Sequence, residues 1–105
     1  MIRFFRLAAI LAIATLSTPA ALAQDTTINI KSFHFMPMNV TVTPGSSVTW
    51  KNLDEEPHTV TSESGLFASG GLDTNESFTF KFDKPGVYKY RCSIHPQMTA
   101  TVTVK

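Results

Sequence analysis

Apolar and polar residues alternate with a period of two along most of the chain after residue 26. Such alternation is typical of strands that bury one face. Turn-forming pairs follow or precede several of these runs, and no segment has a helical period long enough to predict a helix. We therefore expect an all-β domain, an antiparallel sandwich or barrel. The predicted strands lie within residues 27–31, 40–43, 48–51, 78–83, 88–92 and 101–105.

The phase of the alternation predicts two local features. It changes between Ile30 and Phe33, which we interpret as a bend or bulge near Ser32. In the run 88–92 the even positions hold two tyrosines and Cys92, whereas the odd positions hold a lysine and an arginine. Cys92 is therefore expected to point inward at the end of a strand.

The N-terminus has the features of a secretory signal peptide. Two arginines precede a short apolar run at 7–16, and a small-x-small cleavage site ends at Ala23. We expect residues 1–23 to be a cleaved signal peptide and residues 24–105 to form a single domain. The alternative is an uncleaved N-terminal anchor, for which the apolar run is short.

Charge and cysteine content narrow the function classes. Without Arg3 and Arg6, seven basic residues face eight acidic ones, and no basic stripe suggests nucleic acid as a partner. The acidic residues 54–56 are interpreted as a solvated loop. They are adjacent, so they cannot face one another as an acid–base pair, and we expect the protein not to be an enzyme.

A single cysteine in a small exported domain cannot form an internal disulfide, which favours a role as a metal ligand.

Three soft donors lie close together near the C-terminus. Cys92, His95 and Met98 are each three residues apart. Pro96 disfavours a helical conformation at His95, so we expect a tight loop that folds back over the strand end. Zinc sites do not use thioethers, whereas two histidines, a cysteine and a weak axial methionine are the ligands of a blue-copper site. The spacing therefore predicts three of four copper ligands.

Two histidines are candidates for the fourth ligand. His58 has the same parity as Val60, which places it on the core side, whereas His34 is expected to face solvent. We favour His58. His34, Met36 and Met38 carry a second hypothesis, a secondary Cu(I) site. The alternative is that these methionines pack at one end of the sandwich while His34 is exposed.

Four segments together resemble the cupredoxins, the family of blue copper proteins. The resemblance covers nearly all of residues 24–105, and the short Cys-x-x-His-x-x-Met spacing is most similar to that of the amicyanins. The longer gap between histidine and methionine in plastocyanin is absent. The segments that carry the resemblance to the cupredoxins are Val48–Asn52, Pro57–Val60, Gly86–Cys92 and His95–Met98.

The resemblance implies a Greek-key β-sandwich that binds one copper ion, cycling between Cu(I) and Cu(II), through His58, Cys92, His95 and Met98. It further implies an electron-transfer protein of the bacterial periplasm, monomeric and not bound to a membrane once the signal peptide is removed. Its partners would be redox proteins such as a dehydrogenase or a c-type cytochrome, docking near His95 and Pro96. Copper oxidases and nitrite reductases contain cupredoxin domains but need further copper sites. A carrier or buffer of periplasmic copper that uses the same ligands is the alternative.

Two positions depart from the family pattern. Thr59 stands where members often have an asparagine that ties the two ligand loops together, and its hydroxyl could take over this role. Backbone amides near Thr59 are expected to donate hydrogen bonds to the Cys92 sulfur. Ala100 stands where many relatives have glycine, a change we expect to affect only a local turn.

Overall fold

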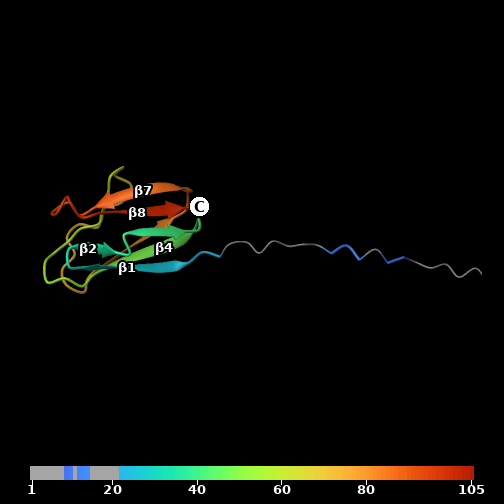
Figure 1. Cartoon of the computed structure of the whole chain (residues 1–105), viewed down its shortest axis with the longest axis horizontal. Helices are drawn as coiled ribbons and strands as arrows, with labels where there is room; N and C mark the ends of the chain where they lie inside the picture. Colours follow the sequence, from blue (N-terminus) through green and yellow to red (C-terminus); the bar gives the residue numbers. More distant parts are fainter. Residues whose placement is uncertain (1–8, 11, 15–21) are drawn as a thin grey trace, which may run out of the picture.

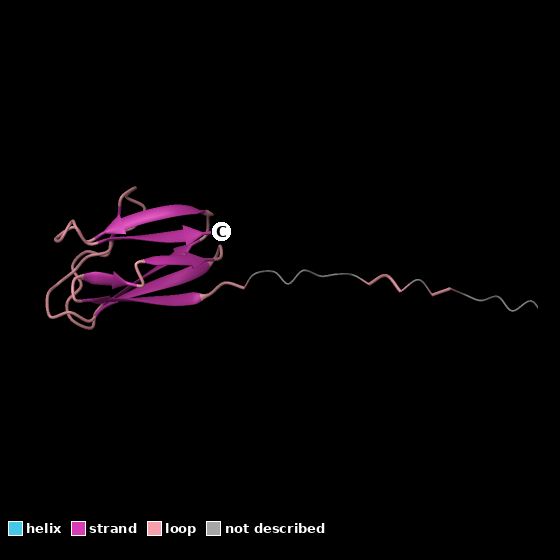
Figure 2. Ribbon diagram, viewed as in Figure 1, coloured by secondary structure: helices cyan, strands magenta, loops and turns pink. Residues whose placement is uncertain are grey.

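The computed structural model describes residues 9–10, 12–14 and 22–105, so most of the expected signal peptide, residues 1–23, lies outside the described residues. No described segment forms a helix that could cross a membrane. Eight strands form two sheets (Figures 1 and 2). One sheet has the order β2 (His34–Met36), β1 (Asp25–Lys31), β4 (Ser46–Asn52), β6 (Ser77–Phe82). The other has the order β3 (Asn39–Val42), β8 (Thr99–Val104), β7 (Gly86–Arg91), β5 (Thr61–Ser62).

The expected all-β sandwich is confirmed, but its sheets are not purely antiparallel. β1 pairs with β4 in parallel, and β3 pairs with β8 in parallel. Between β2 and β7 the chain changes sheet at every step, so strands distant in sequence become neighbours. A period of two is common to both pairing directions, which is why the pattern did not reveal the parallel pairs.

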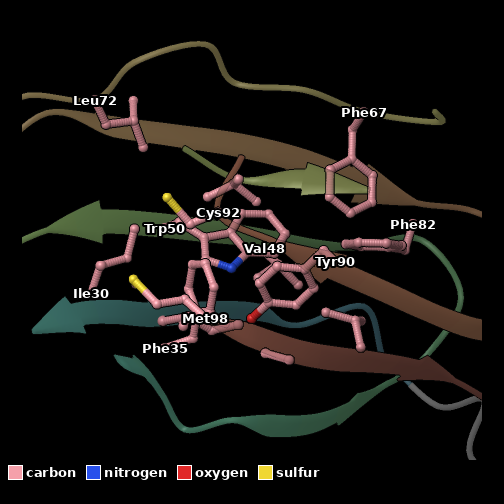
Figure 3. Packing of buried hydrophobic residues seen from close by; sticks show 14 of the residues in the cluster. Ile30, Phe35, Val48, Trp50, Phe67, Leu72, Phe82, Tyr90, Cys92 and Met98 are labelled. Atoms are coloured by element: carbon pink, nitrogen blue, oxygen red, sulfur yellow. The ribbon is translucent and has the colours of Figure 1, made fainter. Parts of the chain in front are cut away.

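The core lies between the two sheets and is rich in aromatic residues. Trp50, Tyr90 and Phe35 are among its largest fully buried side chains, and the Trp50 and Tyr90 rings meet at 5.3 Å between centroids. In Figure 3 the sulfur atoms of Cys92 and Met98 point toward the same end of this cluster. Burial raises the pKa of the Tyr90 phenol well above its ordinary value, so this hydroxyl is neutral.

The change of phase near Ser32 is a hairpin turn and not a bulge. β1 and β2 pair antiparallel with Lys31 opposite His34, which leaves only Ser32 and Phe33 to reverse the chain. Both residues have positive φ, 52° and 59°, as the two central positions of a type I′ turn require. His34 is exposed and Phe35 is buried, as the alternation predicted.

The segment around His58 is extended but is not a continuous strand. Only Thr61–Ser62 forms β5, and His58 pairs with Leu72 through an isolated bridge that contains two backbone hydrogen bonds. His58 and Val60 are fully buried, as predicted, but Thr59 is buried as well. The alternation fails here because this segment is covered on both sides. It lies at the end of the sandwich opposite the C-terminus (Figure 1).

Candidate metal site

The loop after β7 closes tightly on itself, as predicted. The Cys92 amide donates to the Met98 carbonyl at 3.0 Å, and the Met98 amide donates to the His95 carbonyl at 2.9 Å. Cys92 and Met98 are buried, whereas His95 is half-buried. The loop therefore holds a thiol and a thioether inside the protein and leaves one imidazole near the surface.

His58 reaches this loop from a different part of the chain. Its backbone is held by the bridge to Leu72, and its Nε2 lies 2.8 Å from Oδ2 of Asp54. Because the carboxylate is an acceptor, Nε2 carries the proton and Nδ1 keeps its lone pair. Nδ1 is the nitrogen that faces Cys92.

The three donor atoms converge on a common point. The Sγ atom of Cys92 lies 3.9 Å from Nδ1 of His58 and 3.6 Å from Nδ1 of His95, and all three atoms lie within 4.8 Å of one another. Nitrogen and sulfur ligands bound tetrahedrally at ordinary bond lengths are separated by about 3.5 Å. The observed spacing fits a single ion, so this site could hold one copper ion. The structure thus brings His58, and not His34, to Cys92.

Thr59 links the two ligand segments, as expected. Its hydroxyl oxygen accepts a hydrogen bond from the Ser93 amide at 2.7 Å and lies 2.9 Å from the Ser93 hydroxyl. Its own amide donates to Cys92 Sγ at 3.3 Å. Ala100, by contrast, does not lie in a turn: it is paired with Tyr90 in the β7–β8 ladder, so the expected effect on a local turn was wrong.

The thiol of Cys92 is acidic in this environment. Burial alone would raise its pKa, but the Thr59 amide and the imidazoles of His58 and His95 lower it to about 6. These contacts stabilise the negative charge on sulfur. The site therefore favours the thiolate, the form that binds metals.

In the metal-free protein we expect the ultraviolet absorbance of the Cys92 thiolate to titrate with a midpoint near 6. An unperturbed thiol titrates near about 8.5. Between these values the unfolded chain keeps the proton that the folded chain has lost, so the free energy of unfolding should rise with pH across this window. The stability that the Cys92 thiolate contributes should be lost as the pH falls through 6. Cys92→Ser should abolish both the absorbance change and this slope, and a thiolate midpoint above about 8 would contradict the expectation.

Asp54 is a site residue that sequence reasoning missed. It was assigned to a solvated acidic loop, but it is only 7% exposed and its Oδ2 contacts His58. Burial alone would raise the pKa of its carboxyl group. Hydrogen bonds from the Phe33 and Ser32 amides and from His58 lower the pKa below its ordinary value. A separation of four residues in an irregular segment does not fix a contact, so no sequence signal identified this one.

Phe33 is the second residue that was missed. Its ring packs edge-to-face on His58, with centroids 5.1 Å apart, and on His95, with centroids 5.0 Å apart. In the sequence it marked only the end of the phase change that was interpreted as a bend or bulge near Ser32. The hairpin turn instead carries its side chain to the metal end of the sandwich.

The second hypothesis, on His34, Met36 and Met38, receives no geometric support. All three side chains are exposed, and the methionines are about half exposed, at 53% and 51%. The expectation that the methionines pack at one end of the sandwich was therefore wrong, whereas His34 is exposed as expected. A secondary Cu(I) site stays a prediction.

Comparison with known proteins finds relatives both in sequence and in fold. A cupredoxin-like domain model matches residues 6–104. Amicyanin-alpha of Methylorubrum extorquens is 33% identical over 107 aligned residues, covering 97% of this chain and 90% of that protein. Plastocyanin of Scenedesmus fuscus is 33% identical and covers 68% of this chain and 86% of that protein. The structure of a purple cupredoxin from Nitrosopumilus maritimus superposes with a TM-score of 0.72 at 36% identity, covering 77% of this chain and all of that chain.

The fold and the site thus define an all-β protein with a His–Cys–His group that could bind one copper ion. The chain belongs to the cupredoxin family.

Proposed function

We propose that the protein is an exported blue-copper protein that passes single electrons between redox partner proteins. The convergence of two Nδ1 atoms on the Cys92 sulfur carries this proposal. His58, Cys92 and His95 would hold the metal, and the buried thioether of Met98 would offer a weaker fourth donor. When bound, copper supplies the one-electron Cu(I)/Cu(II) couple.

The surrounding residues suit this role because their hydrogen bonds fix the positions of the donors. The Thr59 hydroxyl joins the two ligand segments, and the Met98 carbonyl closes the loop that carries Cys92 and His95. Hydrogen bonds around the ligands orient them and influence the potential of the bound metal. A donor set that moves little keeps the reorganisation on electron transfer small.

Burial of the donors supports a carrier and not an enzyme. His58 and Cys92 are fully buried, so a substrate molecule could not contact their donor atoms. Electrons can pass through half-buried His95, and we propose that partners such as a dehydrogenase or a c-type cytochrome dock near His95 and Pro96. Exposed Ile94 adds apolar surface there, which suits a small transient interface. Export to the bacterial periplasm rests on the sequence pattern of residues 1–23.

The experiment is a visible absorption spectrum of the purified protein after addition of Cu(II), with Cys92→Ser and Ser93→Ala as variants. We expect an intense thiolate-to-copper band in the wild type and in Ser93→Ala. The band should be absent from Cys92→Ser, because serine offers no thiolate. A blue or a purple product would report the geometry of the site. A colourless wild-type product would overturn the electron-transfer proposal.

Rates of copper transfer and of electron transfer distinguish the proposed electron carrier from the alternative, a copper carrier with the same ligands. A carrier should hand its copper to a metal-free acceptor protein faster than it exchanges electrons. An electron carrier should retain copper while a reduced cytochrome or dehydrogenase reduces it. The buried position of Cys92 and Met98 favours retention.

A further inference from the structure

The turn between β1 and β2 has a conformation that its sequence does not favour. Ser32 and Phe33 both have positive φ, a region that side chains other than glycine, asparagine and aspartate rarely adopt. Type I′ turns usually contain Asn-Gly or a similar pair. Local preference therefore does not explain why this turn forms, and the explanation must come from contacts with the rest of the protein.

A single carboxylate provides those contacts. Asp54 Oδ1 accepts a hydrogen bond from the Ser32 amide at 2.6 Å, and Oδ2 accepts one from the Phe33 amide at 2.9 Å. The same Oδ2 lies 2.8 Å from Nε2 of His58. Asp54 is itself held by Asn52, whose side-chain oxygen accepts from the Asp54 amide at 3.0 Å. The carboxylate thus fastens the first hairpin to a histidine of the metal site.

The turn held in this way places an aromatic ring against both histidines. The ring of Phe33 is nearly perpendicular to those of His58 and His95, at 86° and 87°. The two imidazoles also contact each other, with centroids 5.0 Å apart, so the three rings pack mutually. Edge-to-face packing of this kind contributes stability beyond the area that it buries.

His95 depends on this packing more than His58 does. The Nε2 atom of His58 is bound to Asp54, whereas in the part of the chain that the structure describes Nε2 of His95 has no hydrogen-bond partner. His95 is also half-buried, on a loop that includes the turn at Pro96–Gln97. Its ring contacts only the Cys92 sulfur and the rings of His58 and Phe33 among the interactions of the described residues, and Phe33 is the one of these that is not itself a candidate ligand.

We propose that Phe33 is a positioning residue for the metal site. Held in its turn by Asp54, it fixes the imidazole of His95 beside that of His58, so that both Nδ1 atoms face Cys92. This inference rests on the proposed copper function for its consequence, slow loss of metal. The orientation of His95 can be tested without metal.

The turn offers a matched pair of variants, Phe33→Gly and Ser32→Gly. Both relieve one positive φ, and both keep the backbone amide that Asp54 binds, but only Phe33→Gly removes the ring. The first measurement is the rate at which each Cu(I)-loaded protein transfers its metal to a Cu(I) chelator. Changes around a metal ligand typically cost about tenfold or more in metal affinity. We expect Phe33→Gly to release Cu(I) about tenfold faster than the wild type and, when loaded with Cu(II), to show an altered thiolate-to-copper band. Ser32→Gly should behave like the wild type in both measurements. Equal rates and spectra in the two variants would overturn the proposal.

The second measurement uses the metal-free proteins. NMR of the His95 ring should show one sharp set of signals in the wild type and in Ser32→Gly, and broadened or doubled signals in Phe33→Gly. A single sharp set of His95 signals in Phe33→Gly would overturn the proposal even if the wild type binds copper. If the wild type binds no copper, the proposed function fails, and this measurement still decides the role of Phe33. Should Phe33→Gly not fold, Phe33→Asn replaces it, because asparagine tolerates positive φ.

Discussion

Replacing Trp50 by alanine is expected to destabilise the metal-free protein by about 3–5 kcal/mol. Trp50 is fully buried, and its ring packs on those of Phe67 and Tyr90, with centroids 5.7 and 5.3 Å away. A domain of about 80 residues has a total free energy of unfolding of roughly 4–12 kcal/mol. The substitution should therefore remove much of this stability. If the free energy of unfolding of the wild type is near the lower limit of this range, a large fraction of the variant should be unfolded.

Denaturant unfolding followed by fluorescence of tyrosine and by circular dichroism would measure this effect. Trp50→Phe should cost much less, because it keeps most of the aromatic volume. It also removes a buried indole N–H that has no hydrogen-bond partner among the described residues. Val87→Ala, at a side chain 65% exposed, should stay within about 0.5 kcal/mol of the wild type. A loss below about 1 kcal/mol for Trp50→Ala would contradict the described core.

Replacing Asp54 by alanine is expected to cost about 3 kcal/mol of unfolding free energy. The carboxylate loses three partners at once: the Ser32 amide, the Phe33 amide and Nε2 of His58. Hydrogen bonds to a charged acceptor contribute roughly 1.5–3 kcal/mol each. The total is smaller than their sum because the turn is exposed and its amides regain water, whereas His58 is fully buried and cannot.

The adjacent exposed Glu55 provides the control, since Glu55→Ala should change stability by no more than about 0.5 kcal/mol. The difference between the two variants should also depend on pH. Because hydrogen bonds hold the pKa of Asp54 below its ordinary value, its contribution is complete above the ordinary range and is lost as the pH falls through the lowered pKa. The two variants should therefore converge in acid. Equal stability of both variants at neutral pH would show that Asp54 is not the link between the hairpin and His58.

The sequence alone determined those features that depend on neighbouring residues. Alternation with a period of two located the main strands and turned Cys92 inward, because successive side chains on a strand point to opposite faces. The spacing of Cys92, His95 and Met98 predicted a short loop that carries three soft donors, and the structure confirms that loop. The parity of His58 placed it on the core side correctly, although the run in which it lies is not a regular strand.

Only the tertiary structure decided how distant segments meet. The parallel pairs β1–β4 and β3–β8 arise because the chain crosses between sheets, which a local pattern does not record. The same packing brings Asp54 to the first hairpin and carries Phe33 onto both histidines. From its neighbours in sequence Asp54 was expected to be a solvated acid, and the turn that holds Phe33 has a conformation that its own residues disfavour. The positions of both residues are therefore set by long-range contacts, which outweigh local preference.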